Sequence, residues 1–186
     1  MTRSPTSYSL TGLLLVLLTL ADGSAVAEDS AAEVAVKAAI AHKIVKFVSW
    51  PDSRFAAHDE PLRFCVLGGS EVLKAFGKLA DRSIHGRPMS VLPAPDPATV
   101  AEDCDVLYLD GDQEQSVDVW FESVSGQPVL TFGEAGEYGG KGSIVTMRIR
   151  RNKVRFSIDL DANKDTGLRI SAQLLQLATT VGRGGS

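Results

Sequence analysis

Short apolar runs alternate with amphipathic segments through the middle of the chain. The runs have the length and continuity of buried strands, and the segments between them carry apolar residues at helical spacing. Strands that alternate with helices in this way are typical of an α/β fold, with a largely parallel sheet and helices on both faces. The expected strands are 62–67, 88–92, 104–109 and 128–132, and the expected helices are 71–80 and 116–125.

The last third of the chain changes to strict alternation of apolar and polar residues, over 143–150 and again over 153–160. Two alternating strands joined by a two-residue turn at 151–152 predict an antiparallel hairpin with one solvated face. This register places Arg148 directly opposite Arg155, whereas a slip of one residue would separate them. The expected fold is therefore a largely parallel sheet that ends in a hairpin.

The solvated face of this hairpin is a candidate recognition surface. Like charges directly opposite each other on a strand pair are destabilising, so the stability of the fold does not explain two opposed arginines. Arginine is also well suited to bidentate contact with a carboxylate or a phosphate. The alternative is a solvated strand face with no binding role. The candidate partner- or ligand-binding residues are Arg148, Arg155, Asp159 and Arg169.

The segment 31–50 is expected to form a helix that stops at Trp50, before Pro51. Its apolar residues form two adjacent stripes, which together are wider than one core-facing side requires. Such a helix either lies buried between two layers or offers one apolar edge to a partner. In the second case, we expect self-association through Ile40, Ile44 and Phe47.

The N-terminus resembles a secretory signal peptide. A single Arg3 precedes the apolar run 10–20, and Ala25 and Ala27 form the small-x-small pattern of a cleavage site. The run is short for a membrane anchor, which needs about 20 apolar residues. We expect cleavage after Ala27, with residues 1–27 removed and one exported domain formed by residues 28–186.

The chain has two cysteines, Cys65 and Cys104, and both belong to the expected mature part. An even cysteine count in an oxidising compartment favours a disulfide between them. Their spacing matches no metal or redox motif, and a position inside an apolar run is unfavourable for a reactive thiolate. Two buried free thiols remain the alternative.

The net charge and the residue composition do not support the hypothesis that the protein is an enzyme or binds nucleic acid. The chain carries 19 Lys and Arg against 23 Asp and Glu, a net charge of −4, which is not the balance of a nucleic-acid-binding protein. Its three histidines are scattered without metal-ligand spacing, and no nucleophile-elbow motif is present. We therefore expect no catalytic residues, no metal and no cofactor.

Several blocks of the sequence resemble the YfiR family. They are VKAAIAHKIVKFVSWP, PLRFCVLG, GRPMSV, CDVLYL, PVLTF and VRFSIDLDANKDTGLRISAQLLQLA, in that order. The resemblance covers nearly the whole expected mature chain. It implies a periplasmic repressor that holds an inner-membrane diguanylate cyclase inactive through the periplasmic part of that enzyme.

The same resemblance implies release by an outer-membrane lipoprotein, redox sensitivity and a homodimer. Cys65 and Cys104 fall where the family keeps a structural disulfide. A second cysteine pair, present in some members, is missing here, since 138–146 contains no cysteine. A periplasmic module that binds a small anionic ligand remains the alternative function.

Overall fold

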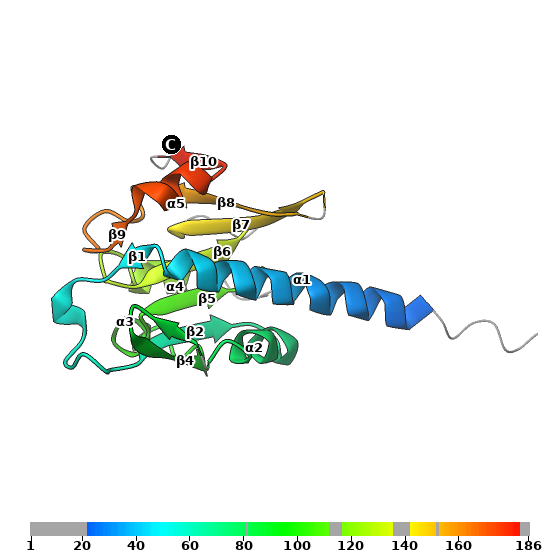
Figure 1. The fold of residues 1–186 in the computed structure, drawn as a ribbon, viewed down its shortest axis with the longest axis horizontal. Coiled ribbons are helices and arrows are strands. Elements are labelled where there is room, and N and C mark those ends of the chain that lie inside the picture. Colours follow the sequence, from blue (N-terminus) through cyan, green and yellow to red (C-terminus); the bar gives the residue numbers. More distant parts are fainter. Residues whose placement is uncertain (1–21, 81, 112–116, 136–141, 152, 183–186) are drawn as a thin grey trace, which may run out of the picture.

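An eight-stranded sheet runs through the computed structural model (Figure 1). The structure describes residues 22–80, 82–111, 117–135, 142–151 and 153–182. The strand order is β10-β8-β7-β6-β5-β2-β4-β3. Its strands are β2 (Leu62–Leu67), β3 (Ser83–Ile84), β4 (Arg87–Pro93), β5 (Val106–Leu109), β6 (Leu130–Glu134), β7 (Val145–Arg150), β8 (Lys153–Asp159) and β10 (Thr180–Gly182).

The sheet is largely parallel, as the sequence predicts. Strand β2 lies parallel to both β4 and β5, and the parallel order continues through β6 to β7. Antiparallel pairs occur between β3 and β4 and between β7 and β8. All four residues of β5 are buried, which is typical of a parallel strand covered on both faces.

Helices cover both faces of this sheet, because successive side chains of a strand point to opposite sides. Phe64 of β2 faces a core that it shares with the first, second and last α-helices. The next residue, Cys65, faces a second core that contains Val100 and Trp120 of the two middle helices. The helices are α1 (Asp22–Val45), α2 (Ser70–Gly77), α3 (Val100–Asp103), α4 (Asp118–Ser123) and α5 (Ala172–Leu177), with a 3-10 turn, η1 (Asp52–Arg54).

The C-terminal hairpin of β7 and β8 has the expected register. Arg148 pairs with Arg155, and Arg150 pairs with Lys153 at the turn. Met147 is fully buried on the opposite face, while the four basic side chains are exposed. The hairpin therefore has one face on the core and one in solvent.

The first helix ends five residues earlier than expected, at Val45 instead of Trp50. The chain then forms β1 (Val48–Ser49), which pairs antiparallel with β9 (Arg169–Ile170) in a small second sheet. Pairing with a segment more than 100 residues away thus overrides the local preference for helix. The expected cleavage position after Ala27 lies within α1, and residues 1–21 lie outside the described part, so the signal peptide stays a prediction.

The wide apolar arc of α1 is used mainly inside the protomer. Ile44 is 2 % exposed and belongs to the core, so this side chain is not available to a partner, contrary to expectation. Ile40 and Phe47 are half-buried and pack against the same core. The physical reason is that α1 packs against α2 and β8 as well as the sheet face. This arrangement matches the alternative in which the helix lies buried inside the protein. Val36 is an exposed apolar residue on this helix, at 49 %.

No helix in the described ranges is both long enough and apolar enough to cross a membrane.

Candidate functional site

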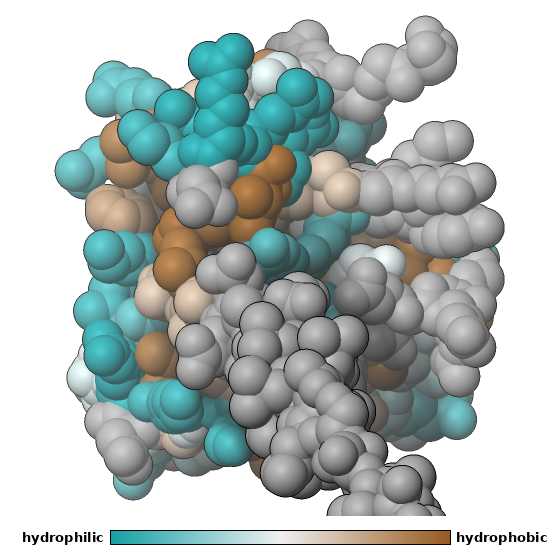
Figure 2. Space-filling view, turned by 90° about the vertical axis from the view of Figure 1, so that its right-hand side faces the viewer, coloured by the Kyte–Doolittle hydropathy of each residue, from teal (hydrophilic) through white to brown (hydrophobic). Residues whose placement is uncertain are grey.

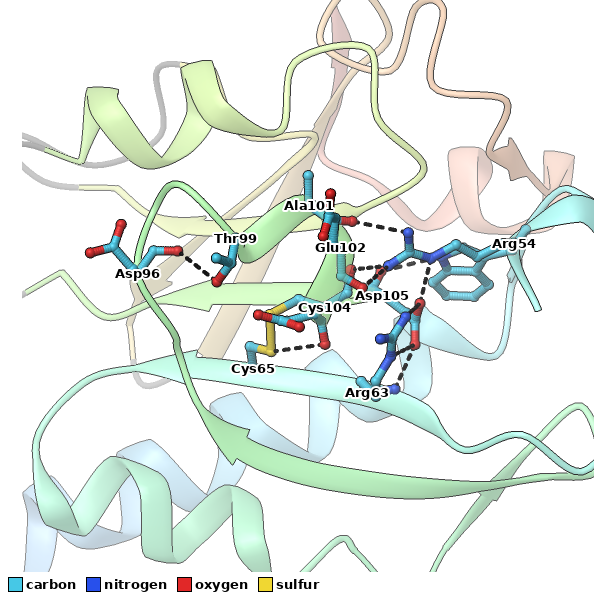
Figure 3. Close-up of a disulfide and its surroundings, with 11 residues drawn as sticks. Arg54, Arg63, Cys65, Asp96, Thr99, Ala101, Glu102, Cys104 and Asp105 are labelled. Carbon is cyan, nitrogen blue, oxygen red and sulfur yellow. Dashed lines mark hydrogen bonds and ion pairs between the residues drawn. A yellow bond between two sulfur atoms is a disulfide. The ribbon is translucent and has the colours of Figure 1, made fainter. Parts of the chain in front are cut away.

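The predicted disulfide is present and joins two neighbouring parts of the buried sheet (Figure 3). Cys65 lies in the middle of β2, and Cys104 directly follows α3, just before β5. Both residues are at most 1 % exposed, and their Cα atoms are 5.8 Å apart. The bond fixes the end of α3 against the sheet over a sequence separation of 39 residues. Neither sulfur is available as a nucleophile in this oxidised form.

Next to the disulfide, the fully buried carboxylate of Asp105 is held by two arginines (Figure 3). Nε of Arg54 donates to Oδ1 at 2.6 Å, and Nη2 of Arg63 donates to the same oxygen at 3.1 Å. The other oxygen, Oδ2, accepts the backbone N–H of Arg63 at 2.7 Å and its Nε at 3.2 Å. A buried charge is tolerated when it is paired and hydrogen-bonded in this way.

The same cluster ties η1 to the start of β5. Arg54 donates to the carbonyl oxygens of Ala101 and Cys104, at 2.9 and 2.7 Å, and the indole N–H of Trp50 donates to the carbonyl of Asp105 at 3.2 Å. Hydrogen bonds to Asp105 raise the pKa of the Arg63 guanidinium above its ordinary value, so this group is permanently charged. The arrangement is saturated with internal contacts, and we interpret it as structural.

A second buried polar cluster lies between α1 and the carboxyl end of β6. Nζ of Lys37 contacts Oε2 of Glu134 at 2.6 Å and Oε1 of Glu33 at 2.8 Å. The hydroxyl of Tyr108 donates to the other oxygen of Glu134. Burial acts to lower the pKa of Lys37, but the hydrogen bonds to Glu134 and Glu33 outweigh it and raise that pKa. Burial, together with the Glu134 carboxylate, raises the pKa of Tyr108 far above its ordinary value, so the phenol stays neutral.

His42 lies on the buried side of α1 and is only 2 % exposed. Among the residues that the structure describes, neither ring nitrogen has a hydrogen-bond partner. Burial, and then the nearby charges of Lys46 and Arg82, lower the pKa of this imidazole. His42 is therefore neutral at pH 7 and fills space in the core.

The structure brings together only two of the four residues expected to bind a partner or ligand. Arg148 and Arg155 are opposite each other on the hairpin. The carboxylate of Asp159 instead accepts the backbone N–H groups of Asp161 and Ala162, at 2.9 and 3.2 Å, and so caps the turn after β8. Arg169 is exposed in β9, at the end of the molecule opposite the hairpin turn (Figure 1). These four side chains do not form one site.

Sequence reasoning missed both buried polar clusters. Asp105 lies directly before a fully buried strand. A charge in that position needs a partner, and this was the signal in the sequence that could have indicated the first cluster. Its partners are 51 and 42 residues away, at Arg54 and Arg63, and no local pattern connects them. For Lys37, a polar residue between apolar stripes of α1 gave no indication of Glu134, which is 97 residues away.

Most of the buried polar side chains that the structure describes take part in internal contacts. Across the described ranges, no group of three or more histidine, cysteine, aspartate or glutamate side chains is arranged to hold a metal ion. In the two polar clusters the buried ionisable groups are paired with one another, His42 is buried without a partner among the described residues, and the cysteines are oxidised.

The YfiR/HmsC-like protein-family model (DUF4154) matches residues 34–179 of the 186-residue chain, which includes the Asp105 cluster, Lys37, Tyr108 and Glu134 of the second cluster, the disulfide and the hairpin. Members of this family are periplasmic proteins that regulate membrane diguanylate cyclases. The chain belongs to the YfiR/HmsC-like family.

Proposed function

We propose that this protein is a periplasmic repressor of an inner-membrane diguanylate cyclase. It binds the periplasmic sensor part of that enzyme, keeps it inactive, and thereby lowers cyclic-di-GMP signalling and biofilm formation. The observation that carries the proposal is the family match over residues 34–179, which covers every strand of the sheet except β10 and reaches helices on both of its faces. The internal contacts of the two buried polar clusters are structural, which agrees with a binding role.

The proposal extends to the partners of the protein. An outer-membrane lipoprotein releases the cyclase by competing for the repressor, and the repressor acts as a homodimer. On α1, the exposed Val36 supports self-association, whereas Ile44 is buried. Sedimentation velocity of the exported protein tests this part: a monomer at every concentration would contradict it.

A pull-down from membranes tests the repressor role. The exported protein, immobilised as bait, should retain a membrane protein with a diguanylate cyclase domain, identified by mass spectrometry. Deleting the gene for the bait should raise cellular cyclic-di-GMP, and expressing the exported protein again should lower it. If the level is the same in both strains, the protein is not a repressor.

A binding module for a small anion is a second candidate, favoured by a cavity of about 520 Å³ between η1 and β3–β4. Arg87 lies over the ring of Phe55, 3.9 Å from its centroid, and both residues line the cavity. His85 is also in the lining; its backbone φ of +52° belongs to the two-residue turn with Gly86 that joins β3 to β4, and its Nε2 lies 2.9 Å from the carbonyl oxygen of Val48. A thermal-shift screen against small carboxylates and phosphates tests this candidate, which fails if no compound raises the unfolding temperature.

A further inference from the structure

On the solvent-facing side of the C-terminal hairpin, the two cross-strand pairs nearest the turn consist of basic residues on both strands. Arg148 lies opposite Arg155, and Arg150 lies opposite Lys153. Arg151 follows in the turn, with a backbone φ of +52°. All five side chains are exposed. We call these five residues the basic tip.

Within the part of the chain that the structure describes, the basic tip has no acidic side chain as a partner. Among the residues that the structure describes, no carboxylate lies within ion-pair distance of any of the five. Asp159, the nearest acidic residue along β8, has its carboxylate bound to backbone N–H groups. The chain as a whole has a net charge of −4, so this local excess of cations is not a general property of its surface.

Apolar residues lie on the other side of the same ribbon. Ile149 pairs with Val154, and both are only half-buried near the turn. Figure 2 looks onto the end of the molecule from which the hairpin projects, and shows a hydrophilic area in its upper part above a hydrophobic band. A cationic edge beside an apolar band is the arrangement with which peripheral proteins meet a lipid surface.

The size of the basic tip favours lipid headgroups over an acidic protein. A specific protein interface needs about 20–30 residues on each side, many more than the end of one hairpin supplies. Clusters of about 4–8 Lys and Arg bind anionic lipids by summed electrostatic attraction, without fixed geometry. The mixture of arginine and lysine around a turn fits this second mode.

We propose that the basic tip binds the phosphate headgroups of anionic phospholipids and holds the protein at a membrane surface. Arg148, Arg150, Arg151, Lys153 and Arg155 contact the headgroups, and the apolar residues near the turn approach the interface. This binding goes beyond repression: it would concentrate the repressor at the bilayer that contains its partner, but it needs no partner to occur.

Co-sedimentation with vesicles tests the proposal on the exported protein alone. We expect binding to vesicles of equal parts phosphatidylcholine and phosphatidylglycerol, and none to pure phosphatidylcholine. Raising the salt to about 1 M shortens the screening length to about 3 Å and should release the protein. Equal binding to both kinds of vesicle, or to neither, would overturn the proposal.

The variant R148Q/R155Q separates the basic tip from the rest of the surface. It removes two of the five cations and should weaken binding to the anionic vesicles by about thirtyfold. Its thermal unfolding should be unimpaired, because the change also removes a repulsive cross-strand pair. The control K74Q/K78Q removes the same charge from exposed positions around the end of α2 and should bind like the wild type.

Three outcomes would contradict the assignment. A folded R148Q/R155Q protein with unchanged vesicle binding would show that the basic tip is not the contact. Saturable binding of inorganic phosphate without vesicle binding would make the basic tip a free-anion site. Binding to native membranes that is lost when their surface proteins are removed by protease, with no binding to the pure lipid vesicles, would identify an acidic protein as the occupant.

Discussion

Replacing Asp105 by Asn should remove much of what fixes η1 and the start of β5 to the sheet. The substitution keeps the size of the side chain but replaces one oxygen by an NH₂ group, which cannot accept. The carboxylate now receives four N–H donors, from Arg54 and Arg63, at 2.6 to 3.2 Å. With one acceptor oxygen left, two of these donors lose their partner inside the protein.

The magnitude follows from burial. Each hydrogen bond to a charged group contributes about 1.5–3 kcal/mol, and breaking a buried ion pair costs about 3–5 kcal/mol. The Arg63 side chain is 27 % exposed, so water compensates for part of the loss on that side. We therefore expect Asp105→Asn to lower the free energy of unfolding by about 3–4 kcal/mol, at the lower part of the combined range.

Equilibrium denaturation of the oxidised, exported protein measures this loss. Asp103→Asn is the matched control, because it makes the same chemical change two residues away at an exposed position. The control should change stability by no more than about 0.5 kcal/mol. If Asp105→Asn costs less than about 1 kcal/mol, the buried carboxylate does not stabilise this region in the way its contacts indicate.

Three further changes test other parts of the fold. Replacing Cys65 and Cys104 together by Ala should lower the free energy of unfolding by about 4 kcal/mol, since the bond closes a loop over 39 residues; denaturation curves that overlay the wild type would refute this. The pKa of buried His42 is lowered from its ordinary 6.5, so the unfolded chain takes up the proton first, and stability should fall as the pH drops from 6.5 toward the folded pKa. His42→Leu should flatten that pH profile, and an unchanged slope would count against the buried neutral imidazole. The pKa of Tyr108 is raised from 10.0, so wild-type stability should fall above pH 10 as the unfolded chain loses this proton, and Tyr108→Phe should fall less steeply in the same titration.

The sheet was predictable from sequence because its strands are buried on both faces. The run 104–109 is continuous and apolar apart from Asp105, and the hairpin strands alternate with a period of two, so each carries its own local signal. The opposed pair Arg148 and Arg155 followed from the same alternation and was confirmed in the register. The expected export and the even cysteine count favoured the disulfide over two free thiols, and the structure contains the bond.

The features that sequence reasoning missed depend on long-range pairing. Strand β1 exists because Val48 and Ser49 meet β9, and nothing in the local segment distinguishes these two residues from the end of a helix. Strand β10 likewise depends on its parallel pairing with β8 at the edge of the sheet. The apolar arc of α1 was correctly predicted to be wide. The packing of α1 against α2 and β8 decides whether Ile44 is covered inside the protein.

Cyclase activity in membranes, with and without the exported protein, tests the repressor role most directly. Membranes that contain the cyclase captured by the bait should convert GTP to cyclic-di-GMP at a rate that falls as the exported protein is added, and saturates at a defined ratio of the two. The Asp103→Asn control should inhibit like the wild type. If the protein leaves the rate of cyclic-di-GMP synthesis unchanged at saturating concentration, in membranes to which it demonstrably binds, it is not a repressor of that enzyme.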